Sequence, residues 1–147
     1  MDGQLRAARL GDAAEIARLA DELGYPVASS EMAERLLRIL PLPVHHVCVV
    51  DGGRTLLGWI AVEQRMTLES GERFEIVGLV VSASARQGGV GRRLVEEAER
   101  WARAAGAGMI SVRSNITRDA SHPFYERLGY VRRKTQHAYN KLLDAPA

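Results

Sequence analysis

The chain of 147 residues contains no run of about 20 apolar residues, so we expect no membrane-spanning helix. Its start, Met-Asp-Gly-Gln-Leu-Arg, lacks the basic and then apolar segments of a secretory signal. The one cysteine, Cys48, lies within an apolar run, and a single cysteine excludes a disulfide inside the chain. These absences favour a cytoplasmic protein in which Cys48 is a small buried side chain.

The chain also lacks internal repeats, low-complexity segments and linkers, so we expect a single domain over residues 1–147. Aromatic residues make up only 5% of the chain and are sparse among the basic residues, which argues against nucleic-acid binding. Charge is divided unevenly: residues 1–81 hold 8 Lys and Arg against 12 Asp and Glu, and residues 82–147 hold 12 against 6. This division favours an anionic ligand near the second half and a cationic one near the first.

Two common phosphate-binding motifs are missing from the glycine-rich stretch at residues 86–94. A P-loop requires Lys after its last glycine, and here Arg92 follows Gly91. A dinucleotide-binding fingerprint requires a third glycine, and here Leu94 occupies that position. Neither ATP-type nor NAD-type binding is therefore predicted from this stretch.

What is present is an apolar strand ending at Val80-Val81, a glycine-rich loop and an amphipathic helix from Val90. Backbone N–H groups at the start of such a helix form a seat for a phosphate or diphosphate. Glycine lets the backbone approach the ligand closely because it has no Cβ. We expect a phosphate-bearing ligand at the loop, where the main-chain N–H groups of the following residues can converge on it: Gln87, Gly88, Gly89, Val90, Gly91 and Arg92. A merely flexible glycine-rich connection is the alternative.

The order Arg86-x-x-Gly89-x-Gly91 resembles the acyl-CoA signature of the GNAT superfamily of N-acetyltransferases. The segment Phe-Tyr-Glu-Arg-Leu-Gly-Tyr at residues 124–130 is similar to a second hallmark of that superfamily. The resemblance covers roughly residues 56–142, and the later segments look like the bacterial branch related to aminoglycoside acetyltransferases. It implies acetyl-CoA as the acetyl donor and an amine as the acceptor, with Arg92 or Arg93 near the 3′-phosphate. It also implies that Arg86 contacts the cofactor and that the strand edge at Leu79, Val80 and Val81 offers backbone groups to the pantetheine arm.

Hydrophobic periodicity and turn residues predict strands at residues 5–9, 46–50, 55–65, 73–81, 109–113, 130–133 and 136–142, and helices at 12–23, 30–40, 90–105 and 118–128. This order indicates an α/β or α+β domain. The resemblance sharpens it to a mixed, mostly antiparallel seven-stranded sheet with helices on both faces. Its central parallel strands, 73–81 and 109–113, would splay apart around the pantetheine arm. A homodimer formed through strand 136–142 is left open.

Acetyl transfer requires a group that removes a proton from the amine, because an amine with a pKa of ~10.4 is mostly protonated near neutral pH. Glu75 is the first candidate, because Glu75-Ile-Val and its spacing of eleven residues to Arg86 resemble the histone acetyltransferase branch. Burial near Phe74, Ile76 and Val77 would raise the pKa of Glu75 toward the range a base needs. Water is an alternative base. So are the following side chains: Glu72, His45, His46 and His122.

The resemblance assigns Tyr125 the role of protonating the departing CoA thiolate, with hydrogen bonding to the sulfur or simple packing as alternatives. Asn115 resembles the residue that contacts the pantetheine arm, although an Asn at a turn is an equal alternative. A backbone N–H at Leu79 or Val80 is expected to stabilise the oxyanion. We predict no metal, because His45-His46 lacks companion Cys or acidic ligands at zinc spacing.

No motif in the first half identifies the acceptor. The two helices expected there carry acidic residues such as Asp21, Glu31 and Glu34, which favours a small cationic amine as the acceptor. Acetylation of a protein Lys or N-terminus, and a non-catalytic acyl-CoA-binding role, remain the competing interpretations.

Overall fold

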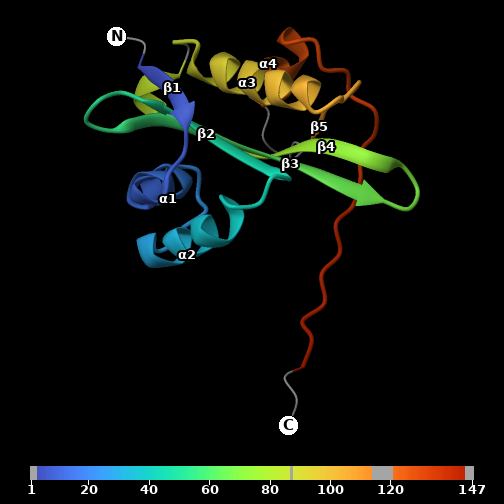
Figure 1. Cartoon of the computed structure of the whole chain (residues 1–147), viewed down its shortest axis with the longest axis horizontal. Helices are drawn as coiled ribbons and strands as arrows, with labels where there is room; N and C mark the ends of the chain where they lie inside the picture. Colours follow the sequence, from blue (N-terminus) through green and yellow to red (C-terminus); the bar gives the residue numbers. More distant parts are fainter. Residues whose placement is uncertain (1–2, 87, 114–120, 145–147) are drawn as a thin grey trace. The chain divides into compact units, whose positions relative to one another are not determined.

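The computed structural model describes residues 3–86, 88–113 and 121–144. The chain divides into two compact units, residues 1–113 and residues 114–147 (Figure 1). Each unit is described here by itself. Within the described residues, no helix combines the length and the hydropathy that a bilayer crossing requires.

The first unit is built around one mixed sheet of five strands in the order β1-β2-β3-β4-β5. All neighbours are antiparallel except β4 and β5, which are parallel as the sequence predicts. The strands are β1 (Gln4–Ala7), β2 (His45–Asp51), β3 (Leu56–Thr67), β4 (Gly71–Val81) and β5 (Ser111–Val112).

Helices cover both faces of this sheet (Figure 1). On one face lie α1 (Ala13–Glu22), preceded by the 3₁₀ turn η1 (Leu10–Asp12), and α2 (Ser29–Ile39). On the other face lies α3 (Val90–Ala104), the crossover between β4 and β5. Each helix presents an apolar stripe to the sheet, which is why the sequence periodicity locates them well.

The core has one layer on each side of the sheet. Between the sheet and α1 and α2 lies a cluster that includes Ile16, Leu19, Leu36, Val49 and Val80. Beneath α3 the apolar stripe of the helix, Leu94, Val95 and Ala98, is fully buried. Burying one such Val or Leu side chain stabilises the fold by about 1.5–3 kcal/mol. The helix that follows the glycine-rich loop is thereby held firmly against the sheet.

A β-bulge interrupts β4 at its centre. Ala61 of β3 pairs with Gly78, whereas the next residue, Val62, pairs with Ile76, so Val77 is an extra residue without a partner in β3. The parallel pairing of β4 with β5 ends at the same level, at Ile76 opposite Val112. A bulge bends its strand and increases its local twist. The remaining residues of β4 therefore extend past β5 toward the glycine-rich loop.

The second unit contains α4 (Ser121–Arg127), which ends at Gly129 with φ 93°. The predicted strands at 130–133 and 136–142 are wrong, because no residue from 130 to 144 is in a strand and residues 131–144 are exposed. The predicted seven-stranded sheet thus has five strands in the described chain. A strand needs a neighbouring edge for its backbone hydrogen bonds, and the two-residue β5 offers very little. The α/β class and the mostly antiparallel order are nevertheless those expected.

Candidate active site

The end of β4 leads into α3 through a short loop that contains the predicted anion seat. After Val81 the chain forms the 3₁₀ turn η2 (Ala83–Ala85), passes Arg86 and Gly88, and enters α3 at Val90. Ser82 anchors the start of this loop, because its N–H donates to the carbonyl oxygen of Leu57 in β3 at 2.8 Å. The backbone N–H groups of the first turn of a helix have no partners within the helix and point outward along its axis. The loop therefore delivers the chain to a helix start that favours anions.

The three glycines of this loop differ in how strongly their backbone conformation and their surroundings require glycine. Gly89 caps α3 in the left-handed conformation, with φ 84°, which strains any residue with a Cβ. A Cβ on Gly88 would lie 3.3 Å from the carbonyl oxygen of Ala85, which is a tight contact. Gly91 is buried in the first turn of α3. The loop thus needs a glycine at Gly89 for its backbone shape, whatever it binds.

The three arginines near the loop differ in their exposure and in their hydrogen-bond partners. Arg86 is exposed, and its Nε donates to the carbonyl oxygen of Val81 at 3.4 Å. Arg92 is also exposed and forms an ion pair with Glu96 at 3.3 Å. Arg93 instead donates to the carbonyl oxygen of Gly3 at 3.2 Å, which ties α3 to the start of the chain. Arg86 and Arg92 are therefore better placed than Arg93 to meet a phosphate.

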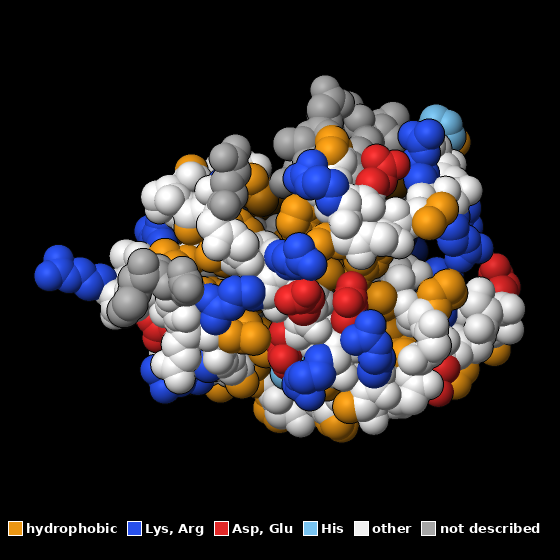
Figure 2. Space-filling view, turned by 90° about the horizontal axis from the view of Figure 1, so that it is seen from above, with side chains coloured by type: hydrophobic (Ala, Val, Ile, Leu, Met, Phe, Trp, Pro, Cys, Tyr) orange, Lys and Arg blue, Asp and Glu red, His pale blue; other side chains and the backbone are white. Residues whose placement is uncertain are grey.

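The exposed face of α3 beyond the loop is not a basic patch. Arg92–Glu96, Arg100–Glu97 and Arg103–Glu99 form ion pairs along it. Seen from above, basic and acidic side chains are intermingled on this face of the molecule (Figure 2). The positive potential that a phosphate would meet therefore comes from the loop and the helix start rather than from a broad field.

The half of β4 beyond the bulge supplies the predicted strand edge. From Gly78 to Val81 the strand pairs with β3, and within the described residues no strand pairs with its other side. The side chain of Val80 is buried in the core, whereas Leu79 and Val81 are partly exposed. An extended ligand with amide groups can add to such an edge as a further strand would.

Glu75 lies where the two parallel strands still pair, opposite Ser111. It is buried, with 4% of its surface exposed. Arg65 Nη2 donates to Glu75 Oε1 at 2.5 Å, and Arg113 Nε lies 3.7 Å from the other oxygen. Sequence reasoning did not anticipate Arg65, because its position across from β4 depends on strand register. Both oxygens of the Glu75 carboxylate therefore lie near a guanidinium group.

The alternative bases are otherwise engaged or lie outside the described side chains. Glu72 accepts a hydrogen bond from Gln64, and His45 lies 3.9 Å from Glu63. His46 Nε2 lies 2.8 Å from Glu97 Oε2 beneath α3. The side chain of His122 is outside the described residues. Of the candidates from the sequence, Glu75 is the one located beside the end of the β4–β5 pairing.

Tyr125 is in α4 of the second unit. Its ring packs edge to face against Phe124 and Tyr130, with ring centroids 5.1 and 5.8 Å apart. Gln87 and Asn115 lie outside the described residues, so their predicted contacts are not addressed by the structure. Packing of the ring and a hydrogen-bonding role for the hydroxyl are compatible, because the hydroxyl projects from the edge of the ring.

α1 reaches the same loop through acidic side chains. Glu22 Oε1 accepts a hydrogen bond from the N–H of Ala83 in η2 at 3.1 Å. Glu15 Oε1 accepts one from the N–H of Leu56, the first residue of β3, at 2.9 Å. Arg18 lies between these carboxylates and pairs with both of them at 2.8 Å. The end of α1 is therefore positioned against the loop that follows β4.

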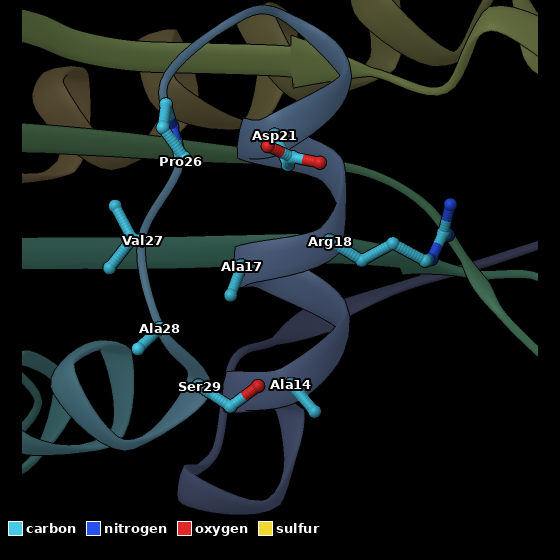
Figure 3. A pocket seen from close by; sticks show the side chains of 8 residues that line it. All are labelled: Ala14, Ala17, Arg18, Asp21, Pro26, Val27, Ala28 and Ser29. Atoms are coloured by element: carbon cyan, nitrogen blue, oxygen red, sulfur yellow. The ribbon is translucent and has the colours of Figure 1, made fainter.

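A cavity of about 460 Å³ lies beside α1, where the chain passes from Pro26 to Ser29 toward α2 (Figure 3). The small side chains of Ala14 and Ala17 leave room on the helix side of this cavity. Its polar lining consists of the carboxylate of Asp21, the guanidinium of Arg18 and the hydroxyl of Ser29. The volume is in the range of small-molecule sites. The cavity runs along α1 from Ala14 to Asp21, and its Asp21 end lies next to Glu22, which contacts the loop.

Comparisons with known proteins bear on this arrangement. The family model described as Acetyltransferase (GNAT) family matches residues 13–130. An uncharacterized N-acetyltransferase of Bacillus subtilis, YhdJ, is 37% identical over 68 residues, which are 46% of this chain and 48% of that protein. The chain therefore matches about half the length of this curated relative.

Solved structures share the fold. An aminoglycoside 6'-N-acetyltransferase from Acinetobacter haemolyticus has a TM-score of 0.82 at 15% identity, covering 96% of this chain and 99% of that one. The enzyme AAC(6')-Iy, in complex with the bisubstrate analog CoA-S-monomethyl-acetylneamine, has a TM-score of 0.83 at 17% identity, covering 95% and 98%. At these identities the likeness concerns the fold.

Proposed function

Because the chain belongs to the acetyltransferase (GNAT) family, we propose that it transfers an acetyl group from acetyl-CoA to the primary amine of a small molecule by direct attack. The observation that carries this proposal is the left-handed Gly89 between the bulged β4 and the start of α3. The segment from β4 through Gly89 to α3 therefore combines a helix start that favours anions with an open strand edge. Coenzyme A has both matching parts, a diphosphate and an arm with two amides.

In this proposal the diphosphate lies over the loop from Arg86 to Arg92, and the pantetheine arm pairs with β4 from Leu79 to Val81. The thioester then lies near the bulge, and an N–H of Leu79 or Val80 supports the developing oxyanion. The sulfur leaves as a thiolate, and Tyr125 supplies the proton that makes it a thiol. The solved relative that holds a CoA-containing bisubstrate analog supports the choice of donor.

The acceptor amine must lose a proton before it attacks. For an amine with a pKa of ~10.4, the cost near neutral pH is roughly 4.6 kcal/mol. We propose that Glu75 receives this proton, directly or through water. Its carboxylate accepts a hydrogen bond from Arg65 Nη2. The role therefore requires Arg65 to adjust its contact as the proton arrives.

The acidic end of α1 supports a small cationic acceptor. The cavity beside α1 is lined by Asp21, whose exposed carboxylate is suited to a second ammonium group. One similar solved structure is an aminoglycoside 6'-N-acetyltransferase, and another holds the bisubstrate analog CoA-S-monomethyl-acetylneamine, which supports this choice. Acetylation of a protein Lys or N-terminus is the alternative that the assay below separates.

The proposal is tested first by turnover. The full-length chain is incubated with acetyl-CoA and panels of aminoglycosides, polyamines and Lys-containing peptides, and released CoA thiol is followed with a thiol reagent. The background is low because the one cysteine, Cys48, is 2% exposed. Turnover with small amines supports the proposal, and turnover with peptides alone replaces it by the alternative. Tight CoA binding without turnover on any amine would indicate a non-catalytic acyl-CoA-binding protein.

The loop is tested by calorimetric titration of CoA into two variants of equal shape, Gly89→Asn and Gly89→Asp. Both introduce a side chain at a left-handed residue, and Asn and Asp tolerate this conformation better than other residues. Only Asp adds a negative charge at the diphosphate. We expect Gly89→Asp to bind CoA at least about tenfold more weakly than Gly89→Asn, because like charges in contact cost several kcal/mol. Equal affinities of the two variants would refute the loop as the diphosphate seat.

A further inference from the structure

Three possible metal ligands converge between the sheet and α3, on the opposite face from α1 and α2. His46 and Cys48 are two residues apart on β2, so both side chains point to the face that α3 covers. Glu97 extends from α3 toward them. Their ligand atoms all lie within 4.8 Å of one another. Sequence spacing did not reveal this group, because Glu97 lies 49 residues after Cys48.

The spacing of these atoms is close to that of a zinc site. His46 Nε2 lies 2.8 Å from Glu97 Oε2 and 3.1 Å from Cys48 Sγ, and Sγ lies 3.9 Å from the same oxygen. Ligands around a tetrahedral Zn²⁺ are roughly 3.3–3.6 Å apart, given metal–ligand distances of about 2.0–2.3 Å. Each of the three separations differs from this range by about half an ångström or less. Small side-chain adjustments would therefore create a coordination triangle.

The chemistry of the group favours a zinc-like ion over the common hard cations. An imidazole, a thiolate and a carboxylate are all established zinc ligands, whereas Ca²⁺ and Mg²⁺ select oxygen ligands. With Cys48 as a thiolate and Glu97 ionised, the three ligands carry two negative charges, which match a divalent ion. Cys48 coordinates as a thiolate, so its thiol proton must leave when an ion binds. A bound ion replaces that thiol proton, which passes to solvent.

Neighbouring side chains hold the ligands in place. The ring of His46 stacks on Trp101 of α3, with centroids 5.3 Å apart and an interplanar angle of 6°. Arg100 Nε donates to Glu97 Oε1 at 2.8 Å, and its Nη2 donates to Oε2 at 2.6 Å. Such outer contacts orient metal ligands in known sites. Arg100 also occupies the oxygen nearest to His46 and Cys48, so it competes with a cation there.

A cavity of about 260 Å³ opens onto the same three side chains and reaches the edge strand β1 at residues 5–7. Its volume exceeds that of a cation and several waters, and water supplies the fourth ligand of many three-residue zinc sites. The cluster therefore has an approach route as well as ligands. Cys48 is 2% exposed, and the side chains of His46 and Glu97 are 19% and 12% exposed.

We propose that His46, Cys48 and Glu97 form a binding site for a zinc-like divalent ion, open to a water ligand on the side of β1. The site lies on the α3 face of the sheet and is independent of the proposed acetyl transfer. It joins β2 to α3, the helix that begins at the glycine-rich loop. Its ligands come from two elements of the same unit, so binding is expected to stabilise the fold.

Cobalt spectroscopy tests this proposal on the full chain without a histidine tag. Co²⁺ replaces Zn²⁺ in tetrahedral sites, and a bound thiolate gives a sulfur-to-cobalt charge-transfer band. Cys48 is the only cysteine, so any such band identifies it as a ligand. We expect one Co²⁺ per chain with this band, displaced by Zn²⁺. We expect Cys48→Ala to abolish the band and Glu97→Gln to weaken binding at least about tenfold.

The matched control is His45→Ala, because His45 is on the same strand but points to the opposite face. It should bind Co²⁺ as the unmodified chain does. Circular dichroism without metal establishes that each variant is folded. Binding without a thiolate band, or equal affinity for the unmodified chain and Glu97→Gln, would overturn the assignment.

A second pair of variants tests whether Co²⁺ affinity can also be raised. Arg100→Gln removes the group that competes for Glu97 Oε2 and should tighten Co²⁺ binding at least about threefold relative to Arg103→Gln. Both variants lose one positive charge on α3, but Arg103 pairs with Glu99 rather than with Glu97. Equal affinities would contradict coordination through Glu97. A hydrogen-bonded cluster without a metal function would not respond in this way.

Discussion

Arg65 of β3 and Glu75 of β4 form a close ion pair in the sheet, with 2.5 Å between Nη2 and Oε1. The residues are ten positions apart, and the turn between β3 and β4 brings them to the same face. Glu75 also faces Ser111 at the point where β4 and β5 still pair. The proposed base is therefore held by a cation at the junction of the two parallel strands. Substitution of Glu75 therefore tests directly whether this carboxylate contributes to catalysis.

Glu75→Gln is expected to lower kcat near neutral pH by about 100-fold if the carboxylate accepts the amine proton. The amide retains the shape and still accepts a hydrogen bond from Arg65, but it cannot take up a proton. Glu63→Gln is the control, because Glu63 also lies near Arg65, at 3.7 Å, but does not face β5. Steady-state rates of both variants and of the unmodified chain are compared across a pH range. An unchanged rate and pH profile would assign the base to water or to another group.

Tyr125→Phe is expected to reduce turnover by about 100-fold while leaving CoA affinity nearly unchanged. Phe retains the edge-to-face contacts with Phe124 and Tyr130 and loses only the hydroxyl. Tyr139→Phe, at an exposed position, should behave as the unmodified chain does. The measurement pairs stopped or continuous thiol-release assays with calorimetry. A near-normal rate would leave Tyr125 with a packing role alone.

Gly58→Ala is expected to lower the free energy of unfolding by about 1–3 kcal/mol, because overpacking forces neighbours to move. The added Cβ would lie 2.9 Å from the carbonyl oxygen of Val80 and 3.0 Å from Val90 Cγ1. It would thus press on both the end of β4 and the start of α3, and CoA affinity should fall as well. Gly108→Ala has open space around it and should change neither property. Urea denaturation and CoA titration of both variants provide the comparison.

Asp12→Asn is expected to lower the free energy of unfolding near neutral pH by about 2 kcal/mol, the size of charge-assisted hydrogen bonds in a buried setting. Hydrogen bonds from Arg6 lower the pKa of Asp12, with a further contribution from the N–H of Arg9. Because the folded pKa lies below the unfolded value of ~3.9, this stabilisation is present above about pH 4 and is lost as the pH falls below it. The difference between variant and unmodified chain should therefore shrink in acid.

The control for this prediction is Asp21→Asn, an exposed carboxylate in α1, the helix that follows Asp12. It should leave the pH dependence of stability unchanged. Denaturation curves at a series of pH values make the comparison. A difference for Asp12→Asn that stays constant down to about pH 2 would show that the ion pair with Arg6 does not carry the effect.

Sequence patterns located most of the fold because they act over short distances along the chain. The apolar stripe of α3, the alternation in β3 and the apolar runs in β2 and β4 each involve residues at most four positions apart. The glycine-rich loop was equally visible, because glycine is the residue that a left-handed backbone such as that at Gly89 favours. The strands expected at 130–133 and 136–142 failed for the opposite reason. Their formation depends on a partner edge, which no local pattern specifies.

By itself, the sequence determined the element order, the loop between β4 and α3, and membership of the acetyltransferase family, since these follow from local periodicity and from residues at constant spacing. Only the tertiary structure decided which side chains meet: Arg65 with Glu75, Glu22 with the N–H of Ala83, and Glu97 with His46 and Cys48. Such contacts join residues 10 to 61 positions apart. They arise from strand register and from the packing of helices on the sheet, which the chain as a whole determines.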